Sequence, residues 1–232
     1  MKALHLLLLL VLIVMPACAH RGPQPLTDAD RSAGIVRFTV GQSVPKVLRA
    51  KAQSVRPDDP ALPALVETLR QELERSGGVG LAAPQLGVSR RVLLIKRGTR
   101  PRGAEPRVEV YLNPSIETAS AESDSDYEAC LSVEGGGGLV RRHVRLVVSH
   151  DTLGGGPRLR TELADWDARI AQHELDHLDG TLFIDRLEGS LVSLDEMRRK
   201  RDELHRRRGW LPPEPQVQEE LPEDPPVSEP RP

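Results

Sequence analysis

The sequence predicts an α+β fold in which mixed or antiparallel β-sheets pack around a central helix that carries an HExxH motif. Two segments place apolar residues three and four positions apart, which is typical of helices with one buried face. Several short segments rich in valine and leucine lie between turns that contain glycine or proline, and these predict strands. Because the strands outnumber the helices, we expect one buried helix to pack against the sheets.

The predicted elements follow one another from residue 61 onward. The first is a helix over Ala61–Arg75, in which leucines and a valine recur at helical spacing before a pair of glycines ends it. The second helix covers Trp166–Gly180, with Asp165 as its N-cap and its final glycine as its stop. The predicted strands are Arg91–Lys96, Arg107–Leu112, Val140–Ser149, Pro157–Glu162 and Thr181–Leu187.

Composition and charge limit the classes of protein to which the chain can belong. Its 232 residues are 38% hydrophobic and 28% charged, which is ordinary for a globular chain and sufficient for one domain with a core. The net charge of -2 and the aromatic content of 3% argue against a nucleic-acid partner, which needs a basic surface or stacking platforms. The chain has two cysteines, which do not form a disulfide framework, so each needs its own explanation.

The N-terminal segment is expected to lie outside the folded domain. Met1–Cys18 combines a positive start, a short apolar run and small residues, which is the pattern of a secretory signal peptide. Cys18 ends a sequence that resembles the lipobox of bacterial lipoproteins and is the candidate for lipidation. Residues 19–33 would then be a tether, and the protein would lie in the cell envelope or periplasm, associated with the membrane only through this segment. A start at Met15 would instead give a cytoplasmic form.

We expect a single folded domain over residues 34–190. Ser193–Arg208 predicts a highly charged helix within a separate segment, residues 191–208, and we expect this helix to be solvated. A role at an anionic membrane surface is the alternative for it. Residues 209–232 are rich in proline and glutamate and cannot bury enough apolar surface to fold, so they are predicted to be disordered.

The most informative motif is His173-Glu174-Leu175-Asp176-His177, in the second predicted helix. Residues four positions apart lie on one face of a helix, so His173 and His177 can bind the same metal ion. Glu174 would lie close enough to hold a water molecule on that metal and to act as a base. Asp176 could be solvated or could orient a ligand histidine, and we expect a structural role for it.

A catalytic metal usually has three protein ligands and an open position, so a third ligand must come from elsewhere in the chain. Asp185, on the short strand predicted after the motif, and Glu188, directly after that strand, are candidate ligands. Cys130 is the better candidate, because a thiolate is a stronger and softer ligand than a carboxylate for Fe(II), Co, Ni or Zn. A lone cysteine is often only a small buried apolar residue, but the helix with two histidines favours the ligand role here.

Three segments together resemble the motifs of the peptide deformylase family. Gly78–Gln85 (GVGLAAPQ) resembles the first motif, Glu128–Ser132 (EACLS) the second and Gln172–His177 (QHELDH) the third, and they follow one another in the family's order. The resemblance covers residues 34–187. HExxH alone is shared with unrelated proteases, but the three motifs together are specific.

The resemblance implies a peptide-deformylase-like fold and a hydrolase that removes the formyl group from N-formylmethionyl peptides and releases formate. It also implies one divalent metal, Fe(II) in the cell with Zn, Ni or Co as substitutes, bound by the cysteine and the two histidines described above. Glu174 would be the base, while the side-chain amide of Gln85 and the backbone N–H of Leu131 would stabilise the charge on the formyl oxygen. We expect the protein to be a monomer.

The substrate peptide is expected to lie against the first motif. Glycines let another backbone approach closely, so the peptide would pair with this segment as an added strand. The methionine side chain would enter an apolar pocket lined by two residues of the second helix, although both could instead belong to the core. The residues expected to contact the substrate are Gly78, Val79, Gly80, Glu128, Ala129, Trp166 and Ile170.

The sequence departs from the family pattern at two places. Ala129 replaces the glycine of the second motif, and its methyl group could crowd the substrate or be tolerated. Gly135–Gly138 follow the second motif, and Gly137 stands near the position of an arginine that helps the family to hold its substrate. We expect the four glycines to form a mobile loop. Two alternatives remain: an exported, catalytically weak deformylase-like protein that binds peptides, and an HExxH metalloprotease in which Cys130 is dispensable.

Overall fold

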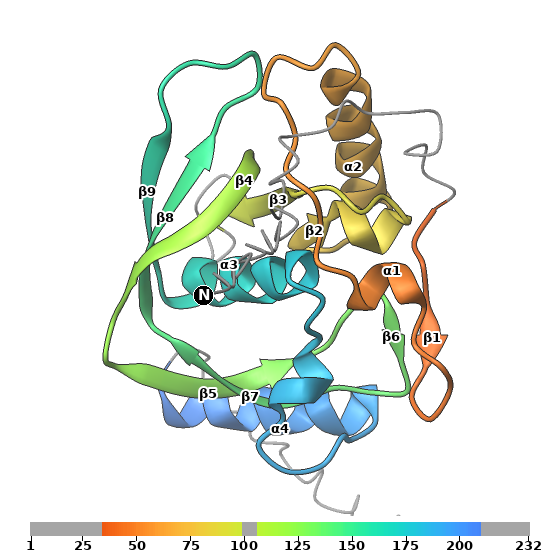
Figure 1. The fold of residues 1–232 in the computed structure, drawn as a ribbon. Coiled ribbons are helices and arrows are strands. Elements are labelled where there is room, and N and C mark those ends of the chain that lie inside the picture. The colour runs from red at the N-terminus through yellow and green to blue at the C-terminus, as the bar shows by residue number, and fades with distance from the viewer. Residues whose placement is uncertain (1–33, 99–105, 210–232) are drawn as a thin grey trace, which may run out of the picture.

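The fold is built around helix α3 (Asp165–Leu178), which lies between a five-stranded sheet and a two-stranded ribbon (Figure 1). The computed structural model describes residues 34–98 and 106–209. The strands of the large sheet are antiparallel and lie in the order β2 (Gly80–Ala82), β3 (Val92–Arg97), β4 (Arg107–Ala119), β8 (Arg145–Asp151) and β9 (Leu159–Ala164). The ribbon pairs β5 (Ser123–Glu128) with β7 (Gly138–His143), and β1 (Phe38–Thr39) pairs in parallel with β6 (Val133–Glu134). The predicted α+β class with a central helix is confirmed.

Two helices cover opposite faces of the large sheet. Helix α2 (Leu62–Ser76) packs on the side of Val92 and Leu94, whereas α3 packs on the side of Leu93 and Ile95. Residues Val92–Ile95 of β3 are therefore buried on both faces of the sheet, which explains why this part of the strand is entirely apolar. The remaining short helices are α1 (Lys46–Arg49) and the 3₁₀ turns η2 (Ala83–Leu86) and η3 (Phe183–Arg186).

Glycines end both long helices of the core. Helix α2 stops at Gly77, which has a φ of 67° and donates its N–H to the carbonyl of Glu74 at 3.1 Å. Gly180, with a φ of 74°, follows α3 at a point where a side chain would collide with the backbone of Arg49. The predicted N-cap of α3 is wrong by one residue, because Ala164 takes that position and Asp165 is the first helical residue.

Two predicted strands need correction. Val140–Ser149 is two strands, because the chain passes at Val144 from β7 in the ribbon to β8 in the large sheet. Thr181–Leu187 does not form a strand. The N–H of Leu182 donates to the carboxylate of Asp185 at 2.8 Å, and this bond closes the 3₁₀ turn η3 instead.

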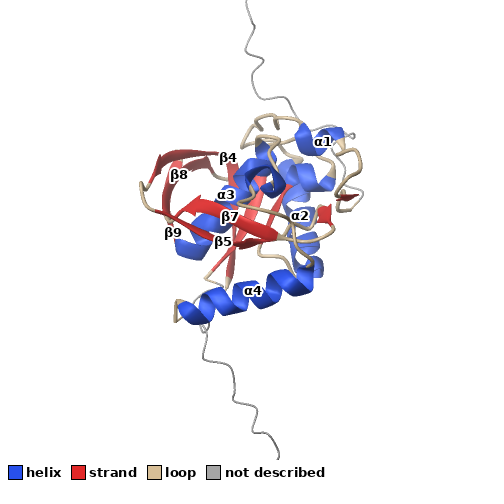
Figure 2. Cartoon of the chain, turned by 90° about the horizontal axis from the view of Figure 1, so that it is seen from below, coloured by secondary structure: helices blue, strands red, loops and turns tan. Residues whose placement is uncertain are grey.

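The charged C-terminal helix α4 (Leu194–Arg207) forms as predicted, and the Ser193 hydroxyl caps it by accepting the N–H of Glu196 at 3.2 Å. The expectation that this helix is only solvated is wrong, because Met197 and His205 are buried. Figures 1 and 2 show α4 running alongside β5 and β7. The helix therefore belongs to the packed structure.

The predicted signal peptide, the tether and nearly all of the predicted tail lie outside the described residues, and so does Cys18. Within residues 34–98 and 106–209, the structure has no helix of the length and apolar character that a membrane span requires.

Candidate metal centre

The structure brings together the three predicted metal ligands, Cys130, His173 and His177, whose ligand atoms all lie within 4.8 Å of one another. Cys130 follows β5, and its Sγ lies 3.3 Å from Nε2 of His177 on α3. Bonds of about 2.0–2.3 Å to one tetrahedral ion place ligand atoms roughly 3–4 Å apart, so this group fits a divalent metal. Two imidazole nitrogens and one thiolate are donors that suit Fe(II), Co, Ni or Zn.

The alternative third ligands, Asp185 and Glu188, point to other partners. Asp185 accepts hydrogen bonds from the guanidinium of Arg49, one of them at 3.1 Å. Glu188 accepts hydrogen bonds from the hydroxyl of Ser125 and, at 2.7 Å, from Arg141. Both carboxylates are therefore engaged in ion pairs on the surface, away from the three ligand atoms.

Glu128 orients His173 from behind. Its Oε2 accepts the N–H of His173 Nδ1 at 2.9 Å, which leaves Nε2 of that ring for the metal. Arg142 donates to both oxygens of Glu128, at 3.0 and 2.9 Å, and Arg169 donates to Oε1 at 2.8 Å. Burial raises the pKa of Glu128, but His173 and Arg142 lower it by more, so the carboxylate is ionised. The sequence led us to expect that Glu128 contacts the substrate, whereas in the structure its carboxylate binds the predicted metal ligand His173.

Two donors point at the sulfur of Cys130. The side-chain amide of Gln85 lies 3.6 Å from it and the backbone N–H of Ser132 lies 3.4 Å from it. Gln85 is held by its other end, since its Oε1 accepts the N–H of Ala82 at 2.8 Å. Burial raises the pKa of the Cys130 thiol, but the adjacent His177 and its partner ligand lower it well below its usual value. This environment favours the thiolate, which is the form that binds a metal.

Glu174 is buried beside Gly80 of β2. A Cβ atom at Gly80 would lie 2.8 Å from both Glu174 Cγ and Ile170 Cγ2 and would also meet Glu174 Oε1, so only glycine leaves room for this carboxylate. Within the described residues, Glu174 Oε2 has no hydrogen-bond partner. Burial raises the pKa of Glu174 to about 7, which suits a general base working near neutral pH. A buried, unpaired oxygen of this kind calls for a polar partner such as a reacting water.

The residues expected to contact the substrate differ in how far they are buried. Ile170 is buried in the core between α3 and the large sheet, whereas Val79 and Trp166 are only partly buried at the edge of that core. Gly78 lies close to Leu131, whose Cδ1 would be 3.2 Å from a Cβ atom at that glycine. Strand β2 is at the edge of the large sheet, so its outer side can accept another strand.

The two departures from the family pattern have different surroundings. Ala129 is exposed, so its methyl group is not packed against the ligands. The expectation of a mobile glycine loop is wrong, because Gly137 exchanges two backbone hydrogen bonds with Val192, at 3.0 and 2.9 Å. A side chain at Gly137 would meet Met197 of α4 and the carbonyl of Glu128. The space that an arginine would need is therefore filled by the C-terminal segment.

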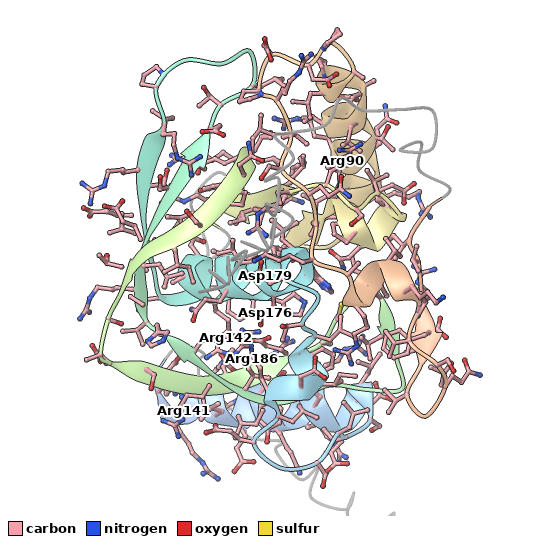
Figure 3. The ribbon with its side chains drawn as sticks, in the orientation of Figure 1. Arg90, Arg141, Arg142, Asp176, Asp179 and Arg186 are labelled. Atoms are coloured by element: carbon pink, nitrogen blue, oxygen red, sulfur yellow. The ribbon has the colours of Figure 1, made fainter. Side chains whose placement is uncertain are left out.

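A cavity of about 1050 Å³ lies beside another face of α3 and contains none of the three ligands. Figure 3 shows Asp176 between α3 and two guanidinium groups of the cavity wall. Asp176 accepts hydrogen bonds from Arg142 at 2.5 Å and from Arg186 at 2.7 Å. These pairs agree with the structural role expected for Asp176.

Sequence reasoning missed the two arginines that hold Glu128. Arg142 was part of a predicted strand and carried no separate signal. Arg169 did carry a sequence signal, because it precedes His173 by one helical turn and lies on the same face of the helix. A cation on the buried face of a helix must have an acidic partner, and that partner is Glu128.

A helix with two metal-binding histidines, a thiol from a neighbouring segment and a buried unpaired carboxylate define the site of a metal-dependent hydrolase. The chain belongs to the polypeptide deformylase family, since the model of that family matches residues 38–191. It is accordingly an amide hydrolase of the peptide deformylase type.

Individual relatives agree with this assignment. The peptide deformylase of Desulforudis audaxviator is 39% identical over 149 residues, which cover 64% of this chain and 92% of that protein. Peptide deformylase 1 of Streptomyces coelicolor is 42% identical over 156 residues, covering 61% of this chain and 69% of that protein. Among solved structures, the Met-Ala-Ser-bound class I type b peptide deformylase of Acinetobacter baumannii is 32% identical with a TM-score of 0.58, covering 66% of this chain and 97% of that chain. The peptide deformylase of Thermotoga maritima is 31% identical with a TM-score of 0.58, covering 67% and 99%.

Proposed function

We propose that this chain hydrolyses the formamide bond of N-formylmethionyl peptides and releases formate. The observation that carries the proposal is the unpaired Oε2 of Glu174, buried next to a thiolate and two imidazoles that can hold one metal. A carboxylate in that position serves hydrolysis and has no purpose in a protein that only binds peptides. The related structure from Acinetobacter baumannii contains Met-Ala-Ser, the kind of peptide that such a reaction would leave.

Each residue of the site has a distinct task in this reaction. A metal held by Cys130, His173 and His177 would supply Lewis-acid polarisation and a water of lowered pKa. Glu174 accepts the proton of the attacking water as the new C–O bond forms at the formyl carbon. It then delivers that proton to the peptide nitrogen as the C–N bond breaks.

Negative charge develops on the formyl oxygen during the attack. We assign its stabilisation to Gln85 Nε2 and to the backbone N–H of Leu131. Gln85 is suited to this task because the bond from Ala82 fixes its amide with Nε2 toward the site. Loss of one such donor typically costs roughly 10²–10³ in rate.

We propose that the substrate peptide lies along the first motif, beside Gly78 and the outer edge of β2. Val79 and Trp166 are the partly buried apolar residues that would contact the methionine side chain. Ile170 would support them from the core. A Trp166→Ala variant should raise KM for formyl-Met peptides more than it lowers kcat, and an unchanged KM would contradict this placement.

We propose Fe(II) as the metal in the cell, with Zn, Ni or Co as substitutes. One thiolate with two imidazoles accepts all four ions, so the supporting argument is the softness of the ligand set and the family resemblance. Metal analysis of protein purified without oxygen would test the choice. Recovery of stoichiometric Zn with no Fe from such a preparation would contradict it.

The activity is tested by formate release from formyl-Met-Ala-Ser with protein loaded anaerobically with Fe(II) or Ni(II). Turnover should be lost in both Glu174→Ala and Cys130→Ser. Cleavage of internal peptide bonds with an active Cys130→Ser variant would identify a metalloprotease instead. One bound metal and bound peptide without any formate would identify a peptide-binding protein.

We further propose that residues 1–18 direct export, that Cys18 is lipidated and that the mature enzyme is a monomer in the cell envelope. The apolar run after Met1-Lys2 and the lipobox-like sequence before Cys18 support this location. Cell fractionation of the wild type and of Cys18→Ser, with sizing of the purified protein, tests these points. Unprocessed wild-type protein confined to the cytoplasm would contradict export.

A further inference from the structure

Helix α4 lies beyond residues 38–191, which the family model matches, yet it is bonded to the strand that leads to the metal centre. The N–H of His205 Nε2 donates to Asp126 of β5 at 2.7 Å, and both side chains are buried. Arg208, at the end of the helix, donates to Oδ2 of Asp124 at 3.0 Å and to the carbonyl of Ser125 at 2.9 Å. The end of α4 is therefore held against β5 by an ion pair and by two further hydrogen bonds.

Asp124 carries this connection inward. Its Oδ1 accepts a hydrogen bond from Nη2 of Arg169 at 2.8 Å, and its backbone carbonyl accepts another at 2.9 Å. Nη1 of Arg169 donates to Glu128 Oε1 at 2.8 Å, and the other oxygen of Glu128 accepts the N–H of His173. Charges of alternating sign thus run without interruption from Arg208 through Asp124, Arg169 and Glu128 to a predicted metal ligand.

Part of this series of ion pairs is buried, which strengthens the interactions within it. The side chains of Arg169 and Glu128 are each 5% exposed, so their attraction is screened little by water. Arg169 precedes His173 by one turn on the same face of α3, and Glu128 bridges the two side chains. A displacement of Arg169 would therefore pull on Oε1 of the carboxylate whose other oxygen sets the angle of the imidazole ring. Asp124, whose side chain is 32% exposed, is fixed from the solvent side by Arg208.

We infer that Arg169 and Arg208 are positioning residues, which act through Asp124 and Glu128 to hold His173 in its metal-binding orientation. Helix α4 then contributes to the geometry of the metal centre through Arg208. The inference rests on the proposed metal site, but it can be tested without the deformylation reaction. Mutations along a network of contacts that links two sites change the coupling between them by roughly 2- to 30-fold.

The test uses the Co(II)-loaded protein, whose visible spectrum reports the geometry of the ligands. Arg208→Ala should change the Co(II) absorption spectrum and weaken Co(II) binding roughly 2- to 30-fold. Arg208→Lys, which keeps the charge, should restore part of both. Arg207→Ala is the matched control, because Arg207 is a neighbouring arginine on α4 that is largely exposed and pairs with Glu203 of the same helix. Its spectrum and affinity should equal those of the wild type.

A second comparison identifies the route. Once Arg169→Met has broken the series, adding Arg208→Ala should change the spectrum and the Co(II) affinity no further. Should Arg169→Met fail to fold, the two Arg208 variants and the Arg207 control still decide the matter. An unchanged spectrum and affinity in Arg208→Ala would overturn the inference, even if that variant melted at a lower temperature. Failure of the wild type to bind Co(II) would overturn the metal site itself and the inference with it.

Discussion

The missing side chain of Gly80 provides the space in which Glu174 lies. A Cβ atom on that glycine would be 2.8 Å from Cγ of the glutamate and would also meet its Oε1. The glycine belongs to the first sequence motif and the glutamate to the third, and strand β2 holds the two in contact. The position of the base is thus set from outside its own helix.

Gly80→Ala should therefore abolish most of the activity. The added methyl group would displace the Glu174 carboxylate, and a positioned general base contributes about 10²–10⁴ in rate. The metal content should stay at the wild-type level because the atoms nearest to the added methyl group belong to Glu174 and Ile170, which are not ligands. Formate release and metal analysis on the same preparation measure both quantities. Wild-type turnover in this variant would mean that the carboxylate can move without loss.

Replacing Glu128 with glutamine should weaken metal binding about 10- to 100-fold, the usual effect of losing the partner that orients a ligand histidine. Thermal stability should fall as well, because Arg142 and Arg169 would keep buried charges with no carboxylate between them. Competition with a chromophoric chelator gives the affinity, and a melting curve gives the stability. Glu122→Gln removes an exposed carboxylate and should change neither.

A side chain at Gly137 should destabilise the protein by disturbing the contact with α4. The new Cβ atom would lie 3.0 Å from Cγ of Met197 and would also meet its sulfur. Overpacking of this kind typically costs about 1–3 kcal/mol, so Gly137→Ala should unfold at lower urea concentration. Combining it with Met197→Ala should recover part of that loss. Additive destabilisation in the double variant would show that the two sites do not share the space.

Glu109 should make stability depend on pH on the acid side. Burial raises the pKa of Glu109, but hydrogen bonds from Tyr111, Arg107 and Arg97 lower it by more, so the folded-state pKa lies below 4.5. A lowered pKa contributes stability that is present above the unfolded value and disappears as the pH falls through the folded value. Glu109→Gln should therefore be less stable than the wild type at neutral pH.

The difference between Glu109→Gln and the wild type should shrink as the pH falls below about 4.5. Urea unfolding at three pH values between neutral and acid would measure it. Glu117→Gln, which removes a more exposed carboxylate that pairs with Arg160, is the control. A difference that stays constant with pH would contradict the assignment to Glu109.

Most of the metal site could be predicted because its information is local. His173 and His177 lie four positions apart, and the segment that contains Cys130 is only five residues long, so each signal can be recognised within a few residues of sequence. Strand β5 could not be predicted in the same way. Its sequence SDSDYE has little β-propensity, and it is held by side chains of α3 and α4 that are remote in sequence, including Arg169 and His205.

The glycine run shows the same limit. Four glycines in sequence favour flexibility, and nothing nearby indicates that Val192 and Met197 pack against them. The single strand predicted over Val140–Ser149 failed for a related reason, since alternating residues cannot tell one strand from two in different sheets. Contacts between distant segments decided each of these cases.

The buried hydrogen bond between Asp126 and His205 affects how this enzyme can be shortened. A fragment that stopped at residue 191, where the match to the family model ends, would lack His205 and so remove the hydrogen-bond partner of the buried Asp126 carboxylate. It would also uncover the space beside Gly137 that Met197 fills. The shortest fragment suitable for crystallisation or inhibitor screening therefore extends through Arg208, and binding measured on a shorter one would report on a protein that lacks the contacts of α4 with β5 and Gly137.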